Sequence, residues 1–118
     1  MNPVVLAFVG DAVYTLFVRE RLALSLKYKT GELDRRTAEI VSAHGQSERL
    51  NQILPLLTEE EEDIFKRGRN AKKPTKSKNA SVAEYVRSTG FEALLGFLYL
   101  TGQTERIEEL LFKDGANE

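Results

Sequence analysis

The sequence predicts an all-α domain, and three observations carry that prediction. Apolar residues recur at the spacing of helical faces, no stretch alternates apolar and polar residues as a strand does, and helix-capping residues separate the apolar segments. The chain has 118 residues, of which 42% are hydrophobic and 30% are charged. It can therefore bury a core, and its length predicts one domain spanning residues 1–118.

The first helix is predicted to begin at the N-terminus and to run to about Leu26. Asn2 is a favoured N-cap residue. Pro3 suits the first helical position, because the N–H that proline lacks would have no helical partner there. After this helix, Thr30–Gly31 is expected to break the chain.

A second helical region is predicted from about Leu33 to Leu54, with Gly45 as the candidate point of division. Pro55 ends this region, because proline cannot continue a helix. The next helix is predicted to open at Thr58, since Glu61 three residues later completes a capping box with it.

Two more helices are predicted in the C-terminal part of the chain. The first opens at Ser81, with Glu84 as its capping-box partner, and ends at Gly102, because glycine is a common helix stop. The second is short and runs from Thr104 to near Gly115.

Two of the predicted helices carry long apolar stretches with one carboxylate each. Asp11 is the only charge between Val4 and Val18, and Glu92 is the only charge between Phe91 and Leu100. Helices that are apolar all round are usually central in a fold, so neither carboxylate is expected to reach water easily. Each should then pair with a cation, cap a buried donor or bind a metal ion. The candidate cations are Arg19, Arg35 and Arg36.

Glycines lie near both carboxylates, with Gly10 before Asp11 and Gly90 and Gly96 around Glu92. Because glycine lets two helices approach closely, these positions favour a meeting of the two carboxylates. Adjacent carboxylates repel each other unless a cation lies between them, and Mg²⁺ binds one or two carboxylates together with water and phosphate oxygens. The pair is therefore a candidate magnesium site.

A basic segment follows an acidic one in the middle of the chain. Residues 59–63 are all acidic, which suits the first turn of a helix, and residues 66–78 contain seven Lys or Arg and no acid. The net charge is −1, but the local field decides what a surface attracts, so this segment is a candidate for phosphate contacts. The alternative is a solvated loop. The candidate RNA-binding residues are Arg67, Arg69, Asn70, Lys72, Lys73, Lys76 and Lys78.

Other residue types narrow the chemistry. The chain has no cysteine and one histidine, which excludes disulfides, thiol catalysis and His-rich or cysteine metal sites. It has no glycine-rich nucleotide motif, and Asp11 interrupts the N-terminal apolar run, so we expect neither a signal peptide nor a membrane span. His44 is a candidate general base, with a surface or structural role as the alternative. Tyr85 is a candidate for stacking near a substrate or for the core.

Two segments, Phe8–Val13 (FVGDAV) and Phe91–Gly96 (FEALLG), resemble the two signature motifs of ribonuclease III catalytic domains. Arg67–Lys72 (RGRNAK) and the longer stretch Thr89–Gly96 are similar to the short branch of that family called mini-ribonuclease III. The resemblance covers nearly the whole chain, and we expect no double-stranded-RNA-binding domain such as the larger enzymes have.

The resemblance implies a ribonuclease III-like helical endonuclease that cuts double-stranded RNA as a homodimer. Asp11 and Glu92 match the catalytic carboxylates, which implies that they bind Mg²⁺. The resemblance implies that this ion activates the attacking water and stabilises the leaving 3′-oxygen. Larger family members have further carboxylates where this chain has Val4, Ala7 and Thr89. Fewer fixed ligands imply more water on the metal ion.

The mini branch also implies a natural substrate, the stem that joins the ends of precursor large-subunit (23S) ribosomal RNA in the bacterial cytoplasm. A large-subunit ribosomal protein is an implied assisting partner. The alternative is a non-catalytic RNA-binding module or ribosome-maturation factor on the same fold, which retention of Asp11 and Glu92 disfavours. A plain helical interaction domain would leave both isolated carboxylates unexplained.

Overall fold

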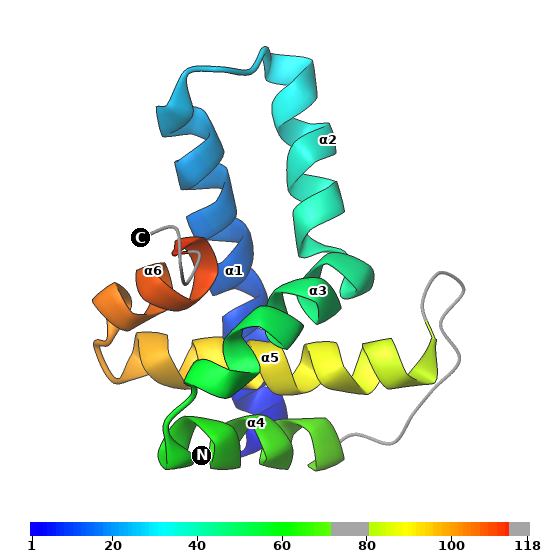
Figure 1. Ribbon diagram of the computed structural model, residues 1–118, viewed down its shortest axis with the longest axis vertical. Helices are drawn as coiled ribbons and strands as arrows, with labels where there is room; N and C mark the ends of the chain where they lie inside the picture. Colours follow the sequence, from blue (N-terminus) through cyan, green and yellow to red (C-terminus); the bar gives the residue numbers. More distant parts are fainter. Residues whose placement is uncertain (72–80, 114–118) are drawn as a thin grey trace.

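The computed structural model describes residues 1–71 and 81–113, and every regular element in these ranges is a helix (Figure 1). The prediction of an all-α fold is confirmed. No helix in the described ranges is long and apolar enough to cross a membrane. The elements are α1 (Pro3–Ser25), α2 (Thr30–Val41), α3 (Ala43–Ile53), the short 3₁₀ helix η1 (Leu54–Leu56), α4 (Glu59–Ala71), α5 (Val82–Leu100) and α6 (Thr104–Phe112).

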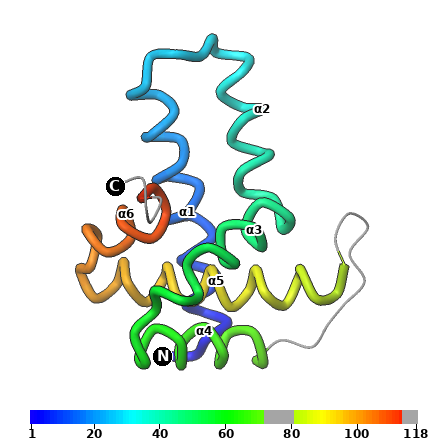
Figure 2. Tube along the Cα trace, viewed as in Figure 1, coloured from blue at the N-terminus to red at the C-terminus, as the bar shows by residue number. Residues whose placement is uncertain are grey.

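Helix α5 forms the centre of the fold. It crosses α1, runs beside α4, and also packs against α3 and α6 (Figures 1 and 2). Phe91, Leu94 and Leu98 of α5 are completely buried, and the ring of Tyr14 from α1 meets Phe91 edge to face at 5.2 Å between centroids. The prediction that this apolar helix is central is therefore confirmed.

The predicted capping residues begin and end the helices as expected. The Asn2 side chain accepts a hydrogen bond from the first turn of α1. Thr58 and Glu61 form both bonds of a capping box, each donating its backbone N–H to the other's side chain, at 3.0 and 3.1 Å. Ser81 caps α5, and Gly102 ends it with a left-handed φ of +76°. Local hydrogen bonding thus fixes most of the helix boundaries.

Three predicted boundaries were wrong. Thr30–Gly31 is the first turn of α2 rather than a break, because the chain already leaves α1 at Leu26, which has a left-handed φ of 59°. The second helical region divides at Ser42 and not at Gly45, since the Ser42 hydroxyl accepts the Gly45 N–H and caps α3. Helix α6 ends at Phe112, before the predicted end, which lies outside the described residues.

Helix α1 is buried along one side only, which corrects the prediction that it is enclosed all round. Its inner side packs on α5 and is formed by residues such as Leu6, Val13 and Tyr14. Its outer side carries a stripe of exposed apolar or small residues: Val4, Val5, Phe8, Ala12 and Leu16. Phe8 is the extreme case, with 81% of its surface exposed. The expected burial of Asp11 is likewise wrong, because Asp11 is exposed in the single chain.

Candidate active site

Glycines bring α1 and α5 into backbone contact. A Cβ atom at Gly10 would overlap the backbone carbonyl of Glu92, and a Cβ at Gly96 would overlap the carbonyl of Leu6. The predicted close approach of these helices is therefore confirmed. Because Asp11 follows Gly10 directly, the crossing lies at both conspicuous carboxylates.

Asp11 and Glu92 line one hollow of about 230 Å³. Asp11 is exposed and Glu92 is half-buried, so the hollow opens to solvent on the Asp11 side. The remaining lining residues carry no charge, and they are Val4, Ala7, Phe8 and Thr89. Within residues 1–71 and 81–113, no ion pair joins Asp11 to Arg19, Arg35 or Arg36. The ion-pair alternative is therefore not realised for Asp11.

The donor set of the hollow suits a hard divalent cation. Carboxylate oxygens are the ligands that Mg²⁺ prefers, and it completes its shell with water and phosphate oxygens. No cluster of three or more His, Cys, Asp or Glu side chains fit for a metal ion occurs in the part of the chain that the structure describes. Thr89 contributes no charge to the hollow, and its hydroxyl donates to the backbone carbonyl of Tyr85 at 3.2 Å. Among the described residues, the hollow thus offers two carboxylates to a metal ion.

Gln46 of α3 contacts Glu92 and was not among the site residues predicted from the sequence. Its Nε2 donates to Glu92 Oε2 at 3.1 Å, although the side chain comes from a separate helix and is only 3% exposed. A signal for it exists, because Gln46, Leu50 and Ile53 follow the 4 and 3 spacing of one helical face. The buried side of α3 therefore includes a glutamine.

A family profile described as Ribonuclease III domain matches residues 4–103. The chain belongs to the ribonuclease III family. Mini-ribonuclease 3 of Symbiobacterium thermophilum is 49% identical, over 94% of this chain and 85% of that protein. Mini-ribonuclease 3 of Staphylococcus aureus is 45% identical, over 96% and 86%. A crystal structure of a protein from Fusobacterium nucleatum is 32% identical, with a TM-score of 0.82 over 94% of this chain and 88% of that one. The chain is accordingly an endoribonuclease of the ribonuclease III family.

The basic end of α4 lies beside the hollow of this ribonuclease III domain. A Cβ at Gly68 would lie 3.0 Å from Gly90 Cα and 3.3 Å from the carbonyl oxygen of Thr89, so α4 and α5 touch next to the hollow. Arg67 and Arg69 flank Gly68, and both are on the last turns of α4. The packing of one glycine thus places the segment that carries two of the predicted RNA-binding cations against α5 at Thr89, which lines the hollow.

Within the described part of the chain, the predicted RNA-binding residues of α4 make only local interactions, with residues of their own helix. Arg67 is exposed and lies 3.9 Å from Asp63. The Arg69 guanidinium lies 5.6 Å from the centroid of the Phe65 ring, and its Nε donates to the Asn70 side chain at 3.1 Å. The other four predicted contacts, Lys72, Lys73, Lys76 and Lys78, lie outside the described residues.

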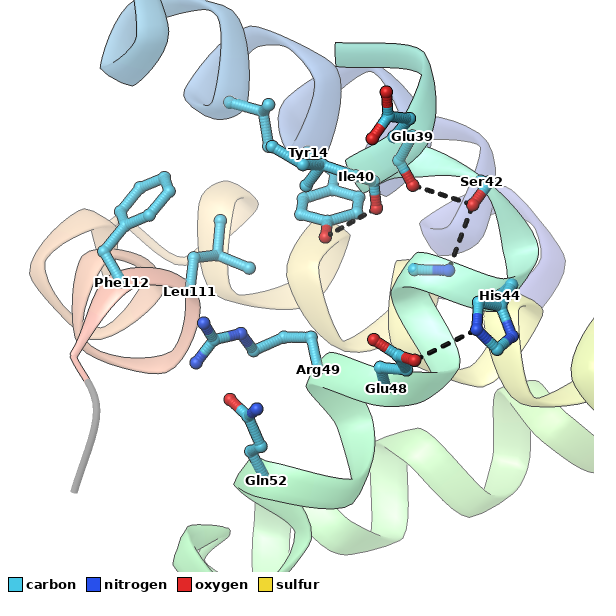
Figure 3. Close-up of a pocket in the computed structure, with 12 residues that line it drawn as sticks. Tyr14, Glu39, Ile40, Ser42, His44, Glu48, Arg49, Gln52, Leu111 and Phe112 are labelled. Atoms are coloured by element: carbon cyan, nitrogen blue, oxygen red, sulfur yellow. Dashed lines mark hydrogen bonds and ion pairs between the residues drawn. The ribbon is translucent and has the colours of Figure 1, made fainter. Parts of the chain in front are cut away.

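A larger cavity of about 620 Å³ lies between α1, α2, α3 and α6, and neither Asp11 nor Glu92 lines it (Figure 3). His44 stands at its rim, exposed, with Nδ1 3.0 Å from Glu84 and Nε2 3.0 Å from Glu48. The hydrogen bond to Glu84 and the charge of Glu48 raise the pKa of His44 and favour its protonated form. The structure therefore places this candidate base outside the hollow, as a link between α3 and α5.

Proposed function

We propose that this chain is a magnesium-dependent endoribonuclease that cleaves double-stranded RNA, with Asp11 and Glu92 as its metal ligands. The observation that carries the proposal is their shared hollow at a glycine crossing of two helices. Asp11 has no ion pair within the described ranges, and its carboxylate shares the hollow with that of Glu92, as a divalent-cation site requires. Membership of the ribonuclease III family, which acts on double-stranded RNA with divalent metal ions, supports the same assignment.

The residues of the hollow have separate tasks in phosphodiester hydrolysis. A bound divalent cation supplies Lewis acidity, which makes water a better nucleophile and offsets charge on the leaving oxygen. Asp11 is exposed, so it holds its side of the site where a phosphate of the RNA backbone can approach. Glu92 is half-buried and is held by a hydrogen bond from Gln46. Ala7 and Thr89 keep the wall free of additional charge.

RNA binding is proposed to use the basic end of α4 and the residues that follow it. Arg67 and Arg69 flank Gly68, whose backbone contacts α5 at Thr89 and Gly90, and Thr89 lines the hollow. Contacts with phosphates provide affinity without reading the sequence, which suits a double-stranded substrate recognised mainly by shape. The proposed contacts are Arg67, Arg69, Asn70, Lys72, Lys73, Lys76 and Lys78.

A homodimer is proposed to form through the exposed apolar stripe of α1. Contiguous exposed apolar surface marks sites of protein association, and this stripe runs along the exposed side of α1 beside Asp11. Val4 and Phe8 belong both to the stripe and to the lining of the hollow. Pairing would therefore place each metal site at the edge of the interface, and two sites would each cut one strand.

The natural substrate is proposed to be the stem of precursor 23S ribosomal RNA in the bacterial cytoplasm, with a large-subunit ribosomal protein as an assisting partner. Support for this finer assignment comes from similarity to mini-ribonucleases of bacteria along nearly the whole chain.

The test is cleavage of a labelled RNA duplex with and without Mg²⁺, by the wild type and by Asp11→Asn. We expect Mg²⁺-dependent cutting that falls more than about 100-fold in the variant, because a direct ligand loses its charge. Duplex binding and the urea unfolding midpoint should be unchanged, since Asp11 is exposed. Asp34→Asn, at an exposed aspartate of α2, is the matched control and should cut normally. Undiminished cutting by Asp11→Asn would refute the assignment.

A further inference from the structure

Gln46 connects three helices at one buried amide. Its Nε2 donates to Glu92 Oε2 of α5 at 3.1 Å and to the backbone carbonyl of Val41 at 3.0 Å. Val41 is the last residue of α2, where carbonyl groups have no partner within their own helix. Both amide protons of Gln46 are thus used, one to cap a helix end and one on a candidate metal ligand.

The direction of this amide is determined by its partners. Reversing it would place the Gln46 Oε1 atom against two acceptor oxygens, which cannot donate a hydrogen bond to it. In the observed direction Oε1 is buried, and it has no hydrogen-bond partner within the described part of the chain. A buried acceptor without a partner costs about 1–3 kcal/mol, which is at least as much as the single hydrogen bond to the Val41 carbonyl contributes, about 0.5–1.5 kcal/mol. Packing alone therefore does not account for a glutamine at this position.

We propose that Gln46 is a positioning residue, which holds the Glu92 carboxylate in the orientation that binds a divalent cation; this inference rests on the proposed function. A neutral amide fixes one carboxylate oxygen without removing its charge, while an arginine or lysine there would compete with the cation. The effect should be large here, because the described hollow offers only two carboxylates to a metal ion.

The decisive variant is Gln46→Met, which keeps the volume and loses the hydrogen bonds to Glu92 and to the Val41 carbonyl. Mn²⁺ binding is measured by titration calorimetry without RNA, and cleavage is measured as a function of Mg²⁺ concentration. We expect Mn²⁺ affinity to fall by about tenfold or more and the half-saturating Mg²⁺ concentration to rise similarly, as for other groups that orient metal ligands. At saturating Mg²⁺ the rate should recover most of its wild-type value, and duplex binding without metal should not change.

Two control variants on the same helix separate positioning from stability. Gln52→Met repeats the chemical change at an exposed glutamine and should leave metal binding unaltered. Ile53→Val removes one buried methylene at a residue that is 1% exposed, and costs about 0.5–1.5 kcal/mol of folding stability without contact with Glu92. Its Mn²⁺ affinity should equal that of the wild type. Loss of affinity in Ile53→Val would mean that destabilisation, and not orientation, explains the effect of Gln46→Met.

A second variant, Gln46→Glu, gives an independent measurement if Gln46→Met folds poorly. The new carboxylate would face Glu92 and repel it, so a divalent cation should raise the melting temperature more in this variant than in the wild type. An equal rise in both proteins, or wild-type Mn²⁺ affinity in Gln46→Met, would overturn the inference while leaving the nuclease intact. A wild-type protein that neither binds nor requires a divalent cation would instead overturn the proposed function and this inference with it.

Discussion

His44 shows how a single side chain can link two helices through charge. It lies between Glu48 of its own helix and Glu84 in the first turn of α5. The pKa of His44 is raised chiefly by its hydrogen bond to Glu84, and the pKa of Glu84 is lowered by the same bond. The interaction is therefore strongest where His44 is protonated and Glu84 is ionised.

We expect His44→Gln to destabilise the chain in mildly acidic solution and to have little effect in alkaline solution. A raised histidine pKa contributes stability below the ordinary value of 6.5, and this contribution disappears as the pH rises through the raised value. The lowered pKa of Glu84 sets the other limit, so the contribution also fades below about 4.5. Urea midpoints of both proteins at about pH 5.5 and about pH 9 test this. A difference of equal size at both pH values would contradict it.

The residues of the candidate site differ in how readily the sequence identifies them. Asp11 and Glu92 stood out because each is a lone charge in an apolar stretch. Gln46 did not, because an amide in a polar-looking segment reads as solvent-exposed until the packing of α3 on α5 is known. The shared hollow of the two carboxylates depended on the crossing of α1 and α5, which glycine spacing suggested without fixing its geometry.

At the level of elements, the crossing of α1 and α5 should tolerate no side chain at Gly10. Gly10→Ala places a methyl group into the backbone of Glu92, so the helices must separate, and we expect a loss of about 3 kcal/mol or more. Gly31→Ala is the matched control, since its Cβ meets nothing within 4 Å and alanine favours the helix by about 0.5–1 kcal/mol. Urea unfolding measures both changes. A Gly10→Ala protein as stable as the wild type would show that the helices can slide apart freely.

Helix α6 is attached to the start of α4 by a nearly buried ion pair. Arg106 donates to Glu61 from Nε at 2.9 Å and from a terminal nitrogen at 2.8 Å, and the Glu61 side chain is 5% exposed. The hydrogen bond from Arg106 is the main reason that the pKa of Glu61 is lowered. The same carboxylate also completes the capping box of α4, so one residue fixes both a helix start and a helix contact.

Arg106→Leu should cost about 3–5 kcal/mol, because it leaves the Glu61 carboxylate buried without its cation. The difference in free energy of unfolding between the variant and the wild type should be at its full value above pH 4.5. It should shrink as the pH falls through the lowered pKa of Glu61. Arg21→Leu in α1 removes an exposed ion pair with Glu108 of α6, at 3.9 Å, and the contact of the Arg21 guanidinium with the Phe112 ring, at 4.6 Å. Together these should cost less than about 2 kcal/mol. Denaturant titrations at several pH values compare the two. Similar losses in both variants would refute the distinction.

Element boundaries were predictable where a capping side chain or a glycine sets them locally. Asn2, Thr58 and Ser81 begin helices as predicted, and Gly102 ends one. The division between α2 and α3 was misplaced because Ser42 has two possible roles, as a helix interior residue or as a cap. Which of these it adopts depends on tertiary contacts that direct the chain across α5.

For the whole molecule, the exposed stripe of α1 should decide the oligomeric state. Phe8→Glu places a charge on its most exposed aromatic residue and should convert the proposed dimer to a monomer, with loss of staggered cutting. Leu24→Glu is the control, because Leu24 is 74% exposed on the same helix but outside the stripe. Sedimentation velocity distinguishes monomer from dimer for each variant. A wild-type monomer at micromolar concentration, or a dimeric Phe8→Glu protein, would refute the proposed interface.

The sequence could not distinguish the two reasons for a helix to be apolar on every side. Enclosure in a core and coverage by a second copy demand the same residue types, and α1 was interpreted as enclosed. The folded chain shows that α5 is buried from Phe91 to Leu98 on its core side while Phe8 of α1 remains exposed, as the proposed dimer requires. The assignment needs the spatial neighbours of both helices, which residue spacing alone does not provide.

The backbone contact at Gly10 and Gly96 has a consequence for heat inactivation. With no side chains between the two helices at the crossing, no softer layer exists that could loosen first and spread the carboxylates while the rest of the domain persists. Catalytic competence and tertiary structure should then disappear in one thermal transition. A plot of residual activity against temperature should superimpose on the thermal unfolding curve measured by circular dichroism. No inactive native-like state should be populated at intermediate temperatures.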